Sequence, residues 1–322
     1  MKKTINFSIL LSALLIGSVS HAQTPEFPQR PITLVIPFGP GSATDQLGRA
    51  IGQGMGEQSQ FPVIIENRPG ASAMIGAQTV ARAAPDGYTI LITTNTTHAA
   101  NEHLYKQLNY DPVKDFRPLT LLGKGGQIMV VNPKSEAKNV VDFITLAKAK
   151  PGSLSFGSGS SSSRIAGELL QQMADIQLLH VPYSSNPNAI TDLLGGQIDM
   201  MITDAATGLP QIQGDRLRAL GVTGKSRSPL ATDIPTIDEA GVPGYEMGYW
   251  FAAYVPAGTP DDVADKLSAM LIKATEGKAA QQFYQQTGTE QVTSTPEELA
   301  SFQQAESKKW GEIIQKAGIT AE

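Results

Sequence analysis

Three Gly-, Ser- and Thr-rich stretches each follow an apolar run directly, and each could hold a small anion. The first comes after Ile32–Ile36, and a helix beginning near Thr44 or Asp45 would offer it free N–H groups and the positive end of a helix dipole. Thr44 stands where a dinucleotide fingerprint has its last Gly, and no Walker Lys follows. A capped strand–helix turn is the competing interpretation. The candidate residues are Phe38, Gly39, Gly41, Ser42, Ala43, Thr44 and Asp45.

The second stretch follows Tyr88–Thr93 and contributes Asn95, Thr97 and His98. Its side chains could cap a helix or donate hydrogen bonds to a ligand. His98 and His103 lie five residues apart and so do not share a helix face as an i, i+4 metal pair would. A capping or surface role is the favoured interpretation of both histidines.

The third stretch follows Leu154–Gly157 and leads into a predicted helix. Its candidate residues are Ser158, Gly159, Ser160, Ser161, Ser162 and Arg164. Gly allows close backbone approach, and the hydroxyl and N–H groups supply donors. A cation at a helix start opposes the dipole, which indicates that Arg164 pairs with a ligand carboxylate. A surface arginine is the alternative.

Several classes of function are excluded by what the sequence lacks. The 322 residues contain no Cys, so thiolate metal sites and Cys nucleophiles are absent, and the net charge of −5 gives no basic stripe for nucleic acid. No G-x-S-x-G motif occurs, and the histidines have no metalloprotease spacing. We therefore predict neither a metal nor a cofactor. Asp204, after Ile198–Thr203, could face a cleft or simply form a turn.

The N-terminus reads as a secretory signal peptide. Lys2 and Lys3 precede the apolar run Ile9–Ile16, and Ser20 and Ala22 are small residues at −3 and −1. Cleavage is expected after Ala22, and no later stretch is apolar for long enough to span a membrane. The sequence thus predicts a soluble protein outside the cytoplasm, most simply in a periplasm.

Short apolar runs alternate with helical patterns along the rest of the chain, which predicts an α/β fold with two mostly parallel sheets. Boundaries are expected near residues 123–126 and 223–226, with the C-terminal third returning to the first domain. Loops at the carboxyl ends of the strands would then face each other across a cleft. The predicted strands are Ile32–Ile36, Val63–Glu66, Tyr88–Thr93, Gln127–Val131, Leu154–Gly157, Leu178–Val181, Ile198–Thr203, Leu217–Thr223 and Phe251–Val255.

The sequence resembles the Bug or TctC family, the solute receptors of tripartite tricarboxylate transporters. The resemblance covers the chain after residue 22 in order and rests on many separate motifs. Its most specific segments are Phe27–Phe38, Val63–Ala71, Ala84–Ile90, Leu179–Tyr183, Asp192–Met201, Leu217–Thr223, Pro235–Tyr245 and Pro256–Pro260.

The resemblance implies a two-lobed, type II periplasmic binding protein with a Venus-flytrap cleft and no catalysis. Lobe 1 would comprise residues 23–123 and 226–322, and lobe 2 residues 124–225. The cleft would hold a carboxylate on the three stretches above, with Tyr183 and Asp204 less central. The chain departs from the family at Ser42, where a Gly is usual, at Ser184-Ser185, where Lys-Gly is common, and at Arg164, where His is frequent.

The expected partners are a small carboxylate and the membrane subunits of such a transporter, and the receptor is expected to be a monomer. Arg164 favours a dicarboxylate, although a citrate-like acid, an acidic amino acid or an aromatic acid such as terephthalate also fits. A periplasmic α/β hydrolase and a carboxylate sensor for a signalling partner are the alternative functions.

Overall fold

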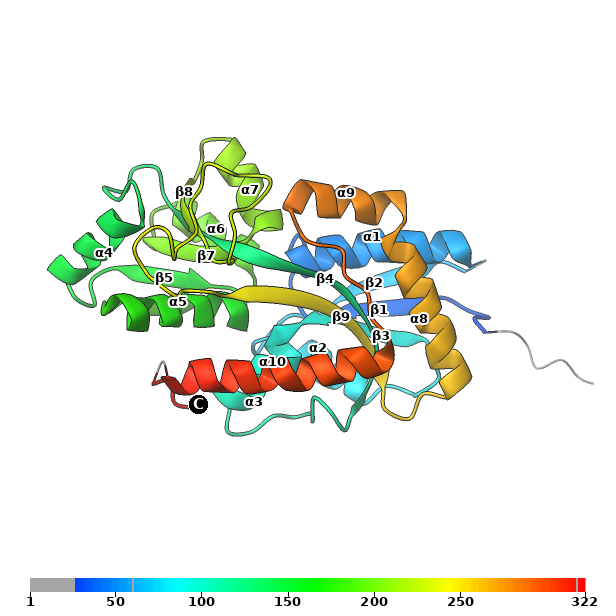
Figure 1. Cartoon of the computed structure of the whole chain (residues 1–322). Coiled ribbons are helices and arrows are strands. Elements are labelled where there is room, and N and C mark those ends of the chain that lie inside the picture. Colours follow the sequence, from blue (N-terminus) through cyan, green and yellow to red (C-terminus); the bar gives the residue numbers. More distant parts are fainter. Residues whose placement is uncertain (1–26, 60, 317, 322) are drawn as a thin grey trace, which may run out of the picture.

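The computed structural model describes residues 27–59, 61–316 and 318–321 (Figure 1). The expected signal peptide, residues 1–22, lies outside the described residues. The strands are β1 (Ile32–Ile36), β2 (Val63–Asn67), β3 (Thr89–Thr94), β4 (Phe116–Val131), β5 (Ser155–Ser158), β6 (Leu179–Pro182), β7 (Met200–Asp204), β8 (Arg218–Val222) and β9 (Gly248–Pro256).

Helices alternate with these strands along most of the chain. The helix predicted after Leu154–Gly157 is present at Ser161–Ala174. The helices are α1 (Ala43–Gln58), α2 (Met74–Ala81), a π-helix (Thr96–Ala100), α3 (Asn101–Leu104), α4 (Val140–Ala149), α5 (Ser161–Ala174), α6 (Asn186–Leu194), α7 (Ala205–Gln213), α8 (Asp261–Thr275), α9 (Lys278–Thr287) and α10 (Pro296–Lys316).

The fold has two lobes that share the long strand β4, which confirms the predicted two-lobed α/β class (Figure 1). In the first lobe β1 lies between β2 and β3 in parallel, and β9 joins β3 antiparallel. In the second lobe β5 pairs in parallel with β6 and β7. The first part of β4 pairs with β9, and its last part pairs with β7 and β8.

The sheets differ from the expectation around β4 and β9. Every pairing of these two strands is antiparallel, so parallel pairing is confined to the outer strands of each lobe. Only Gln127–Val131 of β4 was predicted, because Gly123, Gly125 and Gly126 interrupt its apolar pattern. β4 in fact extends over 16 residues and joins the two sheets into one hydrogen-bonded array.

The segment that precedes β9 packs on the second lobe. Val222 forms a parallel bridge with Thr236, the Met247 N–H donates to the Thr223 carbonyl at 2.9 Å, and the Tyr245 hydroxyl donates to the Ala166 carbonyl at 2.7 Å. These contacts attach residues 236–247 to the second lobe, whereas the expected boundary at residue 226 assigns them to the first.

Packing of α1 on the first sheet fixes the loop after β1. Leu47, Ile51 and Met55, spaced four residues apart, are fully buried and form one face of α1. A Cβ on Gly48 would lie 2.5 Å from Cδ1 of Ile36, so a larger residue there would force the Ile36 side chain to shift. The start of α1 is therefore held firmly beside the carboxyl end of β1.

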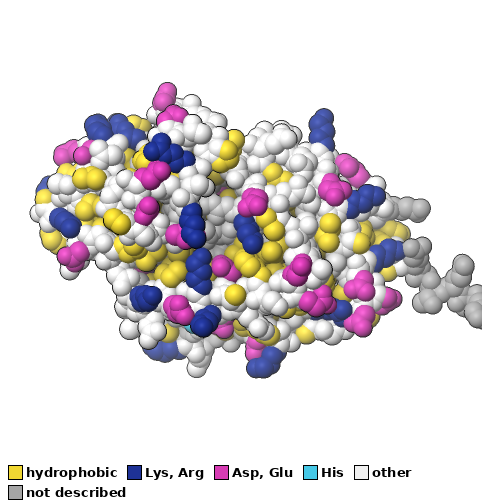
Figure 2. Space-filling view, in the orientation of Figure 1, with side chains coloured by type: hydrophobic (Ala, Val, Ile, Leu, Met, Phe, Trp, Pro, Cys, Tyr) yellow, Lys and Arg dark blue, Asp and Glu magenta, His cyan; other side chains and the backbone are white. Residues whose placement is uncertain are grey.

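The molecular surface carries interspersed charges. Figure 2 shows Lys and Arg side chains alternating with Asp and Glu over both lobes on the face that displays β4, β9 and α10. This face carries no continuous area of one sign, in keeping with the modest net charge of −5.

Candidate functional site

A cavity of about 370 Å³ lies where loops of the two lobes meet. Its first-lobe side comes from Phe38 after β1 and from the loop Gly70–Ala73 after β2, and its second-lobe side comes from the ends of β5 and β6 and the start of α5. The lining residues are Phe38, Gly70, Ala71, Ser72, Ala73, Tyr105, Ser158, Gly159, Ser160, Ser161, Arg164, His180, Pro182, Tyr183 and Ser184.

The structure brings seven of the eighteen predicted site residues to this cavity. Those that line it are Phe38, Ser158, Gly159, Ser160, Ser161, Arg164 and Tyr183. Those placed elsewhere are Gly39, Gly41, Ser42, Ala43, Thr44, Asp45, Asn95, Thr97, His98, Ser162 and Asp204.

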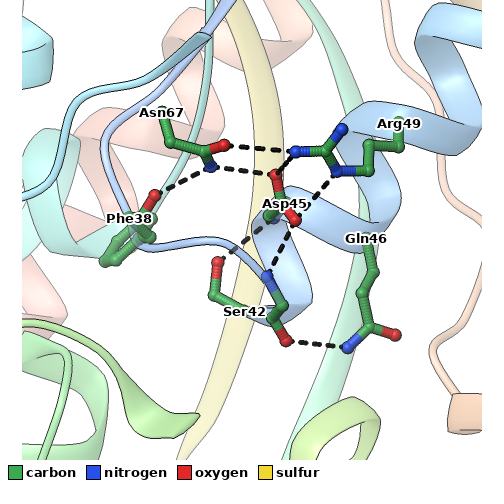
Figure 3. A network of polar contacts seen from close by, with 7 residues as sticks. Phe38, Ser42, Asp45, Gln46, Arg49 and Asn67 are labelled. Carbon is green, nitrogen blue, oxygen red and sulfur yellow. Dashed lines mark hydrogen bonds and ion pairs between the residues drawn. The ribbon is translucent and has the colours of Figure 1, made fainter. Parts of the chain in front are cut away.

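The loop after β1 is organised by the carboxylate of Asp45 (Figure 3). Ser42 caps α1 by accepting a hydrogen bond from the Asp45 N–H at 3.2 Å. The carboxylate accepts from the Gly41 N–H at 2.8 Å, from Asn67 Nδ2 at 2.8 Å and from Arg49 Nε at 3.0 Å. Asp45 is therefore a positioning residue, and its carboxylate takes the Gly41 donor that a ligand was expected to use.

This network also sets the position of Phe38 at the cavity wall. Asn67 Nδ2 donates to the Phe38 carbonyl at 3.0 Å as well as to Asp45. Burial alone would raise the pKa of Asp45, but hydrogen bonds from Arg49, the Gly41 backbone and Asn67 together hold the pKa below its ordinary value. Asp45 is thus ionised at neutral pH and ties α1, β2 and the cavity loop together.

The stretch after β3 folds into the interior. His98 is fully buried, stacks on Tyr254 with ring centroids 3.9 Å apart, and shares a 2.8 Å hydrogen bond with Thr97 Oγ1. Burial lowers the pKa of His98 to about 3, so the ring is neutral. Asn95 is also fully buried, and both of its amide atoms lack a hydrogen-bond partner among the described residues.

The stretch after β5 forms the start of α5 on the cavity wall. Ser160 caps the helix by accepting from the Ser163 N–H at 3.2 Å, and it also contacts the Ser162 hydroxyl at 3.0 Å. Ser158 Oγ lies 2.7 Å from His180 Nε2. Hydroxyl groups and the first N–H groups of α5 therefore gather at this wall.

Close backbone approach between loops requires glycine here. A Cβ on Gly159 would lie 2.0 Å from the carbonyl carbon of Ser185, and one on Gly39 would lie 3.1 Å from the Ser185 hydroxyl. The loops after β1, β5 and β6 thus converge beside Ser185 at the start of α6. Because Gly39 belongs to the first lobe and Ser185 to the second, the lobes touch at this point.

A hydrogen-bonded link joins the lobes on the other side of the cavity. Ser161 Oγ, on α5 of the second lobe, donates to Asn101 Oδ1 of the first lobe at 2.9 Å. Asn101 Nδ2 in turn donates to the Ser72 carbonyl at 2.8 Å, and the Ser72 hydroxyl lies 2.5 Å from the Tyr105 hydroxyl. Hydrogen bonds therefore join the two lobes beside the cavity.

Tyr183 and Asp204 have different places. Tyr183 lines the cavity, and its hydroxyl donates a hydrogen bond to Asp192 at 2.8 Å. Burial is the main cause, and the bond to Asp192 the second, that raises the pKa of Tyr183 to about 12.

Asp204 caps α7 by accepting from the Thr207 N–H at 2.9 Å and also accepts from Asn186. Burial raises the pKa of Asp204 despite these bonds. Asp204 is thus the N-cap of α7 and does not line the cavity.

Arg164 occupies the first turn of α5 at the cavity. Its side chain is only 16% exposed, and its Nε lies 4.0 Å from Glu168 Oε1. Burial raises the pKa of Glu168, and the Arg164 guanidinium opposes that shift. The guanidinium thus places a largely desolvated positive charge at the second-lobe wall.

The loop Gly70–Ala73 is the principal feature that the motif search missed. Three successive non-glycine residues there are left-handed, with φ of 46° at Ala71, 50° at Ser72 and 68° at Ala73. Such conformations are costly and cluster at functional sites. The sequence signal was the Pro69-Gly70 turn after β2. Tyr105 gave no comparable signal, whereas His180, Pro182 and Ser184 lie in or next to the segment Leu179–Tyr183 that carries the family resemblance.

The residues that the structure describes form neither a metal-binding cluster nor a membrane-spanning helix. Within them, no group of three or more His, Cys, Asp or Glu side chains is placed to hold a metal ion. No helix in the same part of the chain is long and apolar enough to cross a membrane.

Comparison with known proteins places the chain among solute receptors. The family model described as the tripartite tricarboxylate transporter family receptor matches residues 47–319. A relative from Pseudomonas sp. strain P51, the UPF0065 protein in the tcbD-tcbE intergenic region, is 35% identical, with 96% of this chain and 93% of that protein covered.

Solved structures of similar proteins support the same family assignment. The periplasmic binding protein BugD is 31% identical, with 92% of this chain and 100% of that chain covered and a TM-score of 0.88. R. palustris Rpa4515 with adipate has 31% identity, the same coverage and a TM-score of 0.89. MatC from Rhodopseudomonas palustris with bound malate has 29% identity, coverage of 89% and 100%, and a TM-score of 0.84. The chain therefore belongs to the tripartite tricarboxylate transporter receptor family, whose members are solute-binding proteins and not enzymes.

Proposed function

We propose that the protein captures a small dicarboxylate in the cavity between its lobes and delivers it to the membrane subunits of a tripartite tricarboxylate transporter. The observation that carries the proposal is Arg164, a largely buried cation on the wall of a cavity that both lobes enclose. Ionised carboxylates make their strongest hydrogen bonds with such a guanidinium.

A second carboxylate has donors on the first-lobe side. Ala71, Ser72 and Ala73 line the cavity, and their N–H groups donate to no acceptor among the described residues. Successive N–H groups in a turn are a common seat for an anion. A ligand with one carboxylate near this loop and another near Arg164 would bridge the lobes and stabilise their closure.

The relatives support this ligand class. Rpa4515 was solved with adipate and MatC with malate, and both ligands are dicarboxylates. We further propose that residues 1–22 direct export to the periplasm and are removed after Ala22. The proposed receptor works there as a monomer. The lobe limits, 23–123 with 226–322 and 124–225, stay a prediction, although the contacts of residues 236–247 favour a later return at β9.

Thermal-shift screening of the purified protein tests the proposal. Binding to the native state alone raises the apparent melting temperature, so a dicarboxylate should shift it in a saturable way. Chromatography of the same mixtures after hours of incubation should show that the ligand is chemically unchanged. Saturable binding confined to monocarboxylates or to uncharged solutes would refute the dicarboxylate assignment.

A further inference from the structure

We propose that the cavity selects dicarboxylates that carry no ammonium group and discriminates against acidic amino acids of the same carbon skeleton. The inference rests on the proposed function, because it narrows the ligand class of that same cavity. It follows from an imbalance between hydrogen-bond donors and acceptors in the cavity lining.

The cavity lining contains few side chains that can carry a charge. Among the described residues that line the cavity, Arg164 is the sole Lys or Arg, His180 is the sole histidine, and there is no Asp or Glu. An ammonium group taken out of water requires an anionic partner or several good acceptors. The lining offers no carboxylate for that purpose.

Carboxylates just outside the lining are already bonded. Asp45 accepts three hydrogen bonds, from Gly41 in the loop after β1, Arg49 in α1 and Asn67 in β2. Asp192 accepts from the Tyr183 hydroxyl at 2.8 Å, and Glu168 accepts from Gln171 Nε2 at 2.7 Å beside Arg164. A ligand ammonium would have to share one of these carboxylates with its present partner to gain a charged partner.

Several backbone acceptors of the lining are in use as well. Six lining carbonyl groups accept a hydrogen bond from another part of the chain, at distances from 2.8 to 3.2 Å. They belong to Phe38, Ala71, Ser72, Ala73, Ser158 and Ser160.

The donors show the opposite pattern. The N–H groups of Ala71, Ser72 and Ala73 have no acceptor among the described residues, and the Arg164 guanidinium lies on the facing wall. Hydroxyls, which could serve an ammonium as weak acceptors, are in part committed, as in the 2.9 Å bond from Ser161 to Asn101. The lining therefore solvates anionic oxygen well and an ammonium poorly.

Titration calorimetry of the full-length protein with matched ligands tests the inference. Succinate and aspartate differ by one ammonium group, as do glutarate and glutamate, and adipate and 2-aminoadipate; malate controls for the size of a 2-substituent. For each diacid that binds, the matching amino acid should have a dissociation constant at least about tenfold higher. If succinate binds, malate should bind with nearly the same affinity as succinate.

A reciprocal variant makes the test sharper. Ser160→Asp keeps a residue type that caps helices well and adds a carboxylate to the cavity wall. The ratio of the dissociation constant of the amino acid to that of its parent diacid should therefore fall by about tenfold. In Ser160→Asn the new side chain has the same size as aspartate and also caps helices, but it carries no charge. This variant should leave the ratio of the two dissociation constants unchanged. Melting temperatures verify that both variants fold.

The outcomes separate the two proposals. If an amino acid binds as tightly as its parent diacid, or if Ser160→Asp and Ser160→Asn behave alike, the ammonium discrimination is wrong while the dicarboxylate receptor stands. If no dicarboxylate of any skeleton binds, the proposed function fails, and the inference that rests on it fails too.

Discussion

Replacement of Arg164 by alanine should weaken dicarboxylates selectively. The side chain is 16% exposed, so a carboxylate that contacts it on closure is mostly shielded from water. Truncating one partner of a buried, hydrogen-bonded charge pair costs about 2–5 kcal/mol. The lower end of that range already corresponds to an affinity loss of about 30-fold.

A second effect of this change is independent of the ligand. Glu168 Oε1 lies 4.0 Å from Arg164 Nε, so Arg164→Ala also removes the nearby charge that opposes the raised pKa of Glu168. The variant is therefore expected to lose some stability even without ligand. Only the ratio between a dicarboxylate and a monocarboxylate of equal length isolates the contact with the ligand.

Calorimetry with adipate and hexanoate, on wild type, Arg164→Ala and Arg164→Lys, measures this ratio. Adipate should lose about 30-fold or more in Arg164→Ala, and hexanoate should change by less than about threefold. Arg164→Lys keeps the charge without the planar fork and should fall between wild type and alanine. Equal losses for both ligands, or none for either, would refute the reasoning.

Three further perturbations have defined outcomes. Ser161→Ala removes the bond to Asn101 and should weaken ligand binding about threefold to tenfold by calorimetry; unchanged affinity would mean that the bond does not favour closure. The lowered pKa of Asp45 contributes stability that is present above about pH 4 and lost as the pH falls through the folded pKa, so Asp45→Asn should flatten the pH dependence of urea unfolding below pH 4. A Cβ in Gly159→Ala would meet Ser185 at 2.0 Å, so both melting temperature and affinity should fall; a variant equal to wild type would show that the loops yield.

The fold could be predicted where burial repeats with a simple period. The run Ile32–Ile36 is buried almost throughout and was recognised with its bounds, and Leu47, Ile51 and Met55 mark the inner face of α1. The crossing strand β4 was predicted only in part, because its middle is Gly-rich and pairs by backbone hydrogen bonds that no side-chain pattern reports.

The candidate site could be predicted on its second-lobe side, where Ser158, Ser160 and Arg164 follow a strand and start a helix. The first-lobe side was harder. Asp45 looked like a ligand contact in the sequence, but its partner Asn67 lies 22 residues away and only folding reveals that its carboxylate is already satisfied. His98 similarly looked polar and available, whereas the structure stacks it on Tyr254 in the core.

The position of β9 in the sheet has a consequence for the order in which the molecule can be assembled. During synthesis from the N-terminus, the edge of β3 stays unpaired until residues 248–256 emerge, because β9 is its neighbour. Strands β5 to β8 and the last part of β4 are all made before then, so the second lobe has its strands first. An unpaired strand edge invites aggregation. The nascent chain therefore exposes this strand edge until residues 248–256 have been made.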